Sequence, residues 1–170
     1  MKHVVQTFPE LEFSISATSR APRGAEQHGV DYYFVTAGQF LADAAAGKFV
    51  EWEEVYNGTH YGTLRAEVER IWDKGNTIIF DVDVKGGVNL KNIFGGQALS
   101  IFIMPPSVEA LRRRLELRGT DSPEAIEKRV AKAEEEMQYA PRFDRVVVND
   151  DLETAVREVE EVISKFLCQT

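Results

Sequence analysis

The sequence predicts an α/β protein in which a parallel sheet is flanked by helices. Three short apolar runs, at residues 77–82, 99–104 and 145–148, have the composition of strands buried on both faces of a sheet. Amphipathic stretches lie between them, and such stretches supply the crossovers that parallel strands require. Smaller alternating strands fall within residues 19–76, so this segment is predicted to form a separate lobe.

Capping signals and alternation place the remaining elements. The predicted helix N-caps are Thr36, Thr63, Ser107 and Ser122. The further segments predicted as strands are residues 11–17, 32–35, 49–56 and 59–62. Helices are predicted near both ends of the chain, at residues 2–8 and 152–166. Residues 18–31 are polar and rich in Gly and Pro, so they are expected to form a loop.

Composition narrows the function classes. The formal charge of -8 argues against binding to a nucleic-acid backbone, which needs a basic surface. No apolar run approaches the ~18 residues of a membrane span, and the N-terminus has no secretory signal. The one cysteine, Cys168, cannot form an intrachain disulfide. We therefore expect a cytoplasmic protein with no nucleic-acid or membrane partner. The oligomeric state stays open.

Two groups of residues in the 19–76 segment suggest a ligand site. Arg20 and Arg23 lie in a proline-stiffened loop and could converge on one phosphate, because guanidinium groups bind its oxygens bidentately. Glu51, on an alternating strand and predicted to share a face with Phe49 and Glu53, could accept the two adjacent donors of guanine. The alternatives are an ordinary charged loop and a surface glutamate.

Further candidates follow the apolar runs. Asp81 and Asp83 come at the end of the first run, where open α/β sheets bind ligands, and could order a magnesium-water shell. The alternative is a helix N-cap beside a surface acid. Arg118 and Arg129 could close over transferring phosphates. Alternatively, they are helix-surface arginines paired with neighbouring glutamates.

These pieces occur together in an order that resembles guanylate kinase over essentially the whole chain. The matching segments are FSISATSRAPR, GVDYYF, FVEWEEV, YGT, FDVDVKGG, IFIMPPS, RGTDS and VVVNDDL. The resemblance implies a P-loop-kinase-type sheet, a GMP-binding lobe and a lid. The residues it implies for the GMP phosphate are Ser16, Arg20, Arg23, Glu26 and Tyr61, with Tyr32 beside them. The residues it implies for guanine are Glu51, Thr63 and Asp83.

The resemblance also implies an ATP side. Arg118 and Arg129 would be lid arginines on the ATP phosphates, and Asn149 would lie near adenine. Asp81 would lie near Mg²⁺, through water. The implied parts are a core of residues 1–18, 77–117 and 130–170, a GMP-binding lobe of residues 19–76 and a lid of residues 118–129.

One departure from the family is large. The phosphate-binding motif GxxxxGKS or GxxxxGKT, whose backbone amides and lysine bind the nucleotide phosphates, has no match in these 170 residues. Residues 1–8 align instead with the end of the helix that would follow that motif. We therefore expect negligible kinase activity from this polypeptide, and restored activity from one extended upstream.

Three hypotheses follow. The first is an enzyme that transfers a phosphoryl group from ATP to GMP with magnesium. The second is a catalytically dead module that binds GMP or phosphorylated or acidic peptides through the arginine site. The third is an α/β fragment that folds poorly alone. Retention of the lid arginines and the guanine-reading acids favours the first.

Overall fold

The computed structural model describes residues 2–56, 58–119 and 121–168, and the chain divides into two compact units. Unit 1 ends at Ile93 and unit 2 begins at Phe94. The predicted boundaries of core, lobe and lid do not follow this division, and they stay a prediction.

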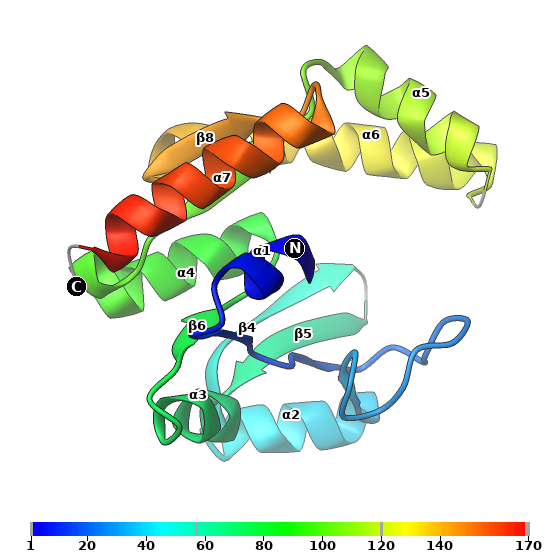
Figure 1. Ribbon diagram of the computed structural model, residues 1–170. Helices are drawn as coiled ribbons and strands as arrows, with labels where there is room; N and C mark the ends of the chain where they lie inside the picture. The colour runs from blue at the N-terminus through cyan, green and yellow to red at the C-terminus, as the bar shows by residue number, and fades with distance from the viewer. Residues whose placement is uncertain (1, 57, 120, 169–170) are drawn as a thin grey trace. The chain divides into compact units, whose positions relative to one another are not determined.

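Unit 1 contains a small mixed sheet with helices around it (Figure 1). Its helices are α1 (Lys2–Thr7), α2 (Ala37–Ala45), α3 (Arg65–Trp72) and α4 (Val84–Phe94), the last of which reaches the unit boundary. Its strands are β1 (Leu11–Phe13), β2 (Ala17–Thr18), β3 (Tyr33–Phe34), β4 (Phe49–Tyr56), β5 (Thr59–Leu64) and β6 (Thr77–Ile79). The largest sheet has the order β3-β2-β5-β4, and β1 pairs in parallel with β6.

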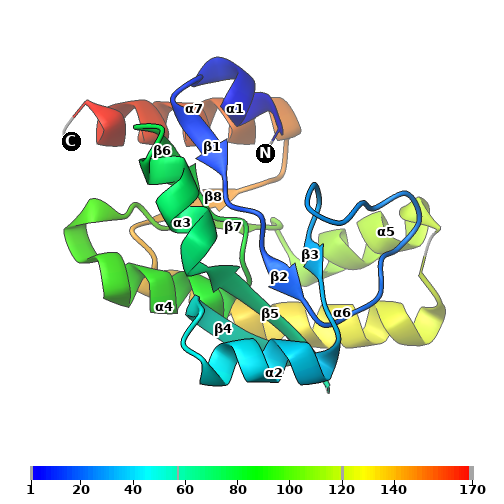
Figure 2. The same ribbon diagram turned by 90° about the horizontal axis from the view of Figure 1, so that it is seen from below.

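A short segment between β1 and β2 joins these two sheets. Residues 11–17, predicted as one strand, form β1 and β2 with a break at residues 14–16. Figure 2 shows the chain passing from β1 directly into β2. The break lets the first half pair with β6 while the second half pairs with β3 and β5. The backbone of Ser14 to Ser16 therefore links the two sheets.

Helices α2 and α4 lie on opposite faces of the β4–β5 hairpin (Figure 1). Phe49 stacks on Phe40 of α2 with ring centroids 4.5 Å apart. By contrast, Glu53 accepts a hydrogen bond from the Asn89 side chain of α4 at 2.7 Å. The predicted shared face of Phe49 and Glu51 is wrong, because the register of β4 shifts between these two residues. The irregularity turns Glu51 towards the α4 side.

Local capping explains where most helices begin. Thr36, Ser107 and Ser122 each accept a backbone N–H bond at a helix N-terminus, as predicted. Thr63 does not cap a helix: it lies within β5, and Leu64 occupies the N-cap of α3 without a side-chain bond. Its hydroxyl instead donates to Glu51, and this stronger charge-assisted partner replaces the expected cap.

Unit 2 pairs β7 with β8 in parallel and places three α-helices after β7. The elements are β7 (Ile101–Met104), α5 (Val108–Arg118), α6 (Pro123–Met137), β8 (Arg145–Val148) and α7 (Leu152–Leu167), with short 3₁₀ turns at Gly95–Gln97 and Ala140–Arg142. Helices α5 and α6 pack through a buried cluster of Leu115, Ile126 and Val130.

The three apolar runs all form strands, but the prediction that they are buried on both faces is wrong for the described residues. Ile103 in β7 is 47% exposed and Val148 in β8 is 45% exposed, whereas Val147 is fully buried. Strand β6 is also shorter than its apolar run and ends at Ile79. Within the described part of the chain each of these strands pairs with one neighbour, so less of its surface is covered.

Candidate functional site

Arg20, in the loop after β2, is the centre of a cluster of polar and aromatic contacts. Its two terminal nitrogens donate to the two carboxylate oxygens of Glu26, at 2.6 and 2.8 Å. Its Nε donates to the hydroxyl of Tyr61 on β5 at 3.0 Å. The guanidinium also lies over the Tyr32 ring, 4.9 Å from its centroid. Bonds from three directions hold this cation in one orientation.

The charges of this cluster reinforce one another. Hydrogen bonds from Arg20 and from the Arg23 backbone N–H lower the pKa of Glu26 to about 2. The Glu26 carboxylate in turn raises the pKa of Arg20 above its ordinary value. Burial raises the pKa of Tyr32, so its phenol stays protonated at neutral pH. The cluster therefore holds a charged Arg20, paired with the ionised Glu26, beside the protonated phenol of Tyr32.

Glu26 closes the loop that carries both predicted arginines. The backbone N–H of Arg23 donates to Glu26 Oε2 at 2.8 Å, and the Arg23 side chain is exposed. An ionised carboxylate accepts hydrogen bonds and donates none, and the implied role of Glu26 in holding the phosphate stays a prediction. In the described structure the Glu26 carboxylate fixes the orientation of the Arg20 guanidinium.

Glu51 and Thr63 form a second, buried group. They face each other in the β4–β5 register, and the Thr63 hydroxyl donates to Glu51 Oε1 at 2.7 Å. Glu51 is 8% exposed and Thr63 is fully buried. Burial raises the pKa of Glu51, and the charges of Asp83 and Glu53 raise it further, against the hydrogen bond from Thr63. A carboxylate with one oxygen bonded and so little solvent is a strong acceptor for a ligand's N–H groups.

Asp83 borders this group at the start of α4. Its Oδ1 accepts the backbone N–H of Gly86 at 2.7 Å, which is the helix-capping role named as the alternative. Gly86 is close to both acids: a Cβ on it would lie 3.0 Å from Glu51 Oε2 and 3.2 Å from Asp83 Oδ1. Asp81 lies just before, with an exposed side chain. Helix α4 was not predicted, and its glycine permits the close approach of the carboxylates.

Strand β5 joins the two groups. Tyr61, which bonds Arg20, and Thr63, which bonds Glu51, are two residues apart on this strand. Side chains at that spacing point to the same face of a sheet. Unit 1 therefore brings a fixed cation and a buried carboxylate to one face of the β4–β5 hairpin. Ser16 is tied to the same region, since its carbonyl accepts the N–H of Tyr33 at 2.9 Å.

In unit 2, Arg118 and Arg129 converge on one carboxylate. Arg118 at the end of α5 donates to Asp121 Oδ2 at 2.5 Å, and Arg129 of α6 lies 3.3 Å from Asp121 Oδ1. Neither arginine pairs with a neighbouring glutamate in the described structure, contrary to the surface alternative. Two cations from different helices are thus gathered at one point.

Asn149 follows β8 in unit 2. Its backbone N–H donates to the Met104 carbonyl at 2.8 Å, and its own carbonyl accepts from Arg114 at 2.6 Å. Arg114 also donates to the carbonyl of Asp150 at 2.8 Å. The backbone of the segment after β8 is therefore fixed to β7 and to α5.

Sequence reasoning missed Glu67, Arg70, Asp121 and Gly86. Glu67 of α3 is only 3% exposed and bonds to two other segments. A signal for it exists, because Glu67 lies four residues before the buried Ile71 and so falls on the core face of its helix. A carboxylate at such a position needs internal partners.

Two other kinds of site have no counterpart among the described residues. No cluster of three or more His, Cys, Asp or Glu side chains in the described ranges has the arrangement of a metal site. No helix among the same residues combines the length and apolar character of a membrane span.

Comparisons with known proteins agree on one family. The family model for guanylate kinase matches residues 1–166. Guanylate kinases of Bacteroides thetaiotaomicron and Porphyromonas gingivalis are 57% and 54% identical to this chain, covering 92% and 94% of it and 77% and 85% of the relatives. A crystal structure of guanylate kinase from Anaplasma phagocytophilum matches with a TM-score of 0.76 and 33% identity, over 96% of this chain and 81% of that one. This similarity confirms the predicted α/β fold of P-loop-kinase type.

Proposed function

The chain belongs to the guanylate kinase family, and we propose that it binds GMP in unit 1 for phosphoryl transfer from ATP. The observation that carries the proposal is the placement of Tyr61 and Thr63 on one face of β5. Through these two residues a fixed guanidinium and a buried carboxylate lie at neighbouring points of one surface. A nucleoside monophosphate has the complementary pair of groups, an anionic phosphate and a base with N–H donors.

The phosphate would bind at Arg20. Its guanidinium is pre-oriented by Glu26 and stays charged, so little conformational entropy is lost on binding. We propose that Arg23, Tyr61 and Ser16 add further donors to the phosphate oxygens. Tyr32, whose ring lies under Arg20, would support that cation from behind.

Guanine would bind at Glu51 and Thr63. The N1–H and 2-amino groups of guanine are adjacent donors that one carboxylate can accept together, whereas adenine lacks this donor pair. The Thr63 hydroxyl fixes the orientation of the Glu51 carboxylate, and an Asp83 oxygen lies near the same point of Gly86 as Glu51 Oε2. A site built to pair with these donors leaves its buried acid unpaired when the wrong base enters, which gives strong discrimination.

The ATP side of the proposal rests on unit 2. Arg118 and Arg129 would bind ATP phosphates, because two cations at one point suit a polyanion. Asn149, held by its backbone after β8, would lie near adenine. These cations would stabilise the charge that spreads over the transferring phosphoryl group.

Magnesium would accompany ATP. Protein sites for Mg²⁺ use one or two carboxylates, often through water, together with the phosphates of the substrate. Asp81 fits this role because it is exposed two residues after β6, whereas Asp83 already accepts the Gly86 N–H. When bound, the ion neutralises charge on the phosphate oxygens.

In the proposed reaction, an oxygen of the GMP phosphate attacks the γ-phosphorus of ATP, and the bond to the β-phosphate oxygen breaks, giving GDP and ADP. The residues named above act by positioning and by charge, since this chemistry needs no protein nucleophile. We propose a cytoplasmic location. Negligible turnover by the 170-residue polypeptide stays a prediction, as does the peptide-binding alternative, which no feature of the described residues favours.

Calorimetric titration of the folded chain with GMP and with AMP tests the proposal. We expect GMP to bind at least tenfold more tightly than AMP, because only guanine presents two donors to Glu51. A phosphorylated peptide serves as the competing ligand. Absence of GMP binding by protein with a cooperative thermal transition, or preference for the peptide, would overturn the proposal.

A further inference from the structure

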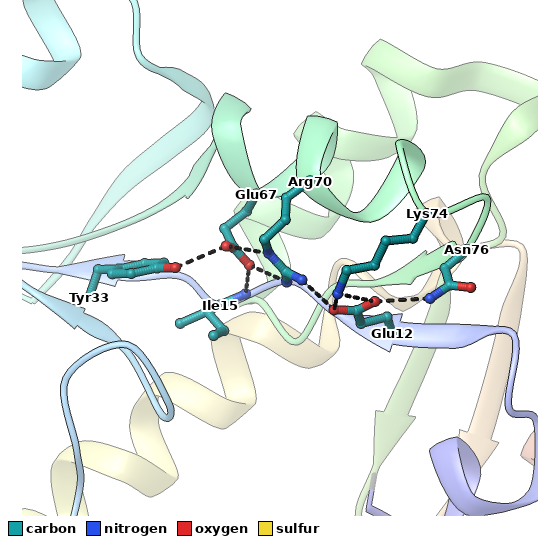
Figure 3. A network of polar contacts seen from close by, with 7 residues as sticks. All are labelled: Glu12, Ile15, Tyr33, Glu67, Arg70, Lys74 and Asn76. Atoms are coloured by element: carbon teal, nitrogen blue, oxygen red, sulfur yellow. Dashed lines mark hydrogen bonds and ion pairs between the residues drawn. The ribbon is translucent and has the colours of Figure 1, made fainter.

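A buried carboxylate outside the proposed contacts connects the segments that carry them. Figure 3 shows Glu67 of α3 between two chain segments that are distant in sequence. Its Oε2 accepts the backbone N–H of Ile15 at 3.0 Å, and its Oε1 accepts the hydroxyl of Tyr33 at 3.0 Å. One side chain thus holds both the segment that connects β1 to β2 and strand β3.

Arg70 holds Glu67 in this position. It donates from Nε and from a terminal nitrogen to the two oxygens of Glu67, at 2.9 and 2.8 Å. Its other terminal nitrogen binds Glu12 of β1, and Glu12 is also bound by Lys74 and Asn76, each at 2.9 Å (Figure 3). The bidentate pair fixes the plane of the Glu67 carboxylate, and Glu12 anchors Arg70 to β1.

The held segments are the ones that the phosphate site needs. Ile15 directly precedes Ser16, and Tyr33 directly follows Tyr32. These segments also bond to each other, through the Tyr33 N–H and the Ser16 carbonyl. Glu67 therefore constrains both segments next to the residues proposed to surround the phosphate, without lying among those residues itself.

The guanine end has a different support. Glu51 and Thr63 are held by the β4–β5 ladder and by their own hydrogen bond. The described hydrogen bonds of the Glu67 carboxylate go to Ile15, Tyr33 and Arg70, and none goes to β4. Loss of the Glu67 carboxylate should therefore disturb the phosphate end of the ligand site more than the guanine end.

The Glu67 carboxylate is ionised in the fold. Burial raises the pKa of Glu67, but the hydrogen bonds from Arg70, the Ile15 N–H and Tyr33 together bring it below its ordinary value. An ionised acceptor can take all of these donors at once. A glutamine would keep the shape but would replace one acceptor oxygen by an NH₂ group facing a donor.

We propose that Glu67, held by Arg70, is a positioning residue for the phosphate end of the GMP site. This inference rests on the proposed function. Its distinguishing consequence is a split between ligands: loss of Glu67 weakens the binding of GMP, and leaves the binding of guanosine, which lacks the phosphate, nearly unchanged.

The test compares Glu67→Gln and Tyr33→Phe with the wild-type chain. Calorimetry gives the Kd for GMP, and NMR titration gives the Kd for guanosine. We expect a GMP Kd raised tenfold or more in Glu67→Gln and about threefold in Tyr33→Phe, with the guanosine Kd changed less than twofold. Glu69→Gln makes the same charge change on the exposed side of α3 and serves as the matched control; it should bind both ligands like the wild type.

Each outcome bears on a separate claim. If the wild-type chain fails to bind GMP, the proposed function is wrong. If the wild type binds and Glu67→Gln binds GMP equally well, or weakens GMP and guanosine by the same factor, the positioning role is wrong. Thermal unfolding shows whether each variant is folded. Should Glu67→Gln fail to fold, the ligand split in Tyr33→Phe, which removes one oxygen atom, decides the question by the same criterion.

Discussion

Replacing Glu51 by Gln gives the sharpest test of base recognition, because it removes a charge and leaves the side-chain shape. Glu51 is 8% exposed and bonds Thr63 through Oε1. The amide oxygen of Gln can keep one acceptor, but its NH₂ group would face a guanine donor or the Thr63 hydroxyl. The variant therefore loses one charge-assisted hydrogen bond and places two donors against each other.

The expected loss follows from those contacts. A hydrogen bond to a charged group contributes about 1.5–3 kcal/mol, and this range corresponds to a Kd raised roughly 10- to 150-fold. The upper part of the range applies if the opposed donors cannot move apart, and the burial of both Glu51 and Thr63 leaves them little room to do so.

Isothermal titration calorimetry with GMP measures the change directly. The charge-matched control is Glu54→Gln on the same strand, where the exposed Glu54 accepts only the backbone N–H of Gly58 among its described bonds. Ribose 5-phosphate, which has the phosphate and no base, should bind Glu51→Gln and the wild type alike. A GMP affinity unchanged in Glu51→Gln, or lost equally in the control, would refute base recognition by Glu51.

The same substitution has a pH signature in stability. Because burial and the neighbouring acids raise the folded-state pKa of Glu51, its ionisation opposes folding once the pH exceeds the unfolded value. The free energy of unfolding of Glu51→Gln relative to the wild type should therefore increase as the pH rises from 4 to 8. Urea unfolding across this range measures the difference, and a difference that shrinks with rising pH would contradict the assignment.

Three further predictions concern unit 1. Arg20→Lys should weaken GMP binding about tenfold or more, because an ammonium group cannot make the parallel hydrogen bonds of a guanidinium to Glu26 together with the bond to Tyr61. Arg65→Lys is the exposed control. An equal GMP affinity of Arg20→Lys and the wild type in calorimetry would contradict the prediction. Ser14→Ala should raise the free energy of unfolding by about 1 kcal/mol in urea titrations, because the buried Ser14 hydroxyl has no hydrogen-bond partner in the described structure; a loss of stability would count against it. Arg70, Lys74 and Asn76 lower the pKa of Glu12 to about 2, so its stabilisation is present above pH 4.5 and is lost as the pH falls towards 2; Glu12→Gln should flatten that part of the stability curve, and an unchanged slope would refute this.

Most elements could be predicted because their signals are local. The caps at Thr36, Ser107 and Ser122 depend on a side chain and a backbone N–H three residues apart. The β4 boundaries were predicted correctly from alternation. The same alternation failed for the face of Glu51, because a register irregularity leaves no trace in a hydrophobic pattern.

The candidate site was predictable as a set of residues and not as a set of contacts. Motif order identified Arg20, Glu26 and Tyr61, whose mutual bonds the structure shows. It could not reveal that Thr63 leaves its expected cap for Glu51, or that Glu67 is buried with partners 34 and 52 residues away. Such partners are fixed by tertiary packing, which overrides local preference. The roles of these residues in ligand binding stay predictions.

The shared carboxylate of Asp121 sets a condition on any anion that unit 2 could capture. Because Arg118 and Arg129 share that one carboxylate, which offsets one of their two charges, an incoming anion has to compete with Asp121 for the two guanidinium groups. Chloride, with a single charge at one centre, has little advantage over a carboxylate held in place. A chain of phosphates carries enough oxygens to reach both guanidinium groups at once, so selection for the longer polyanion follows from the competition itself.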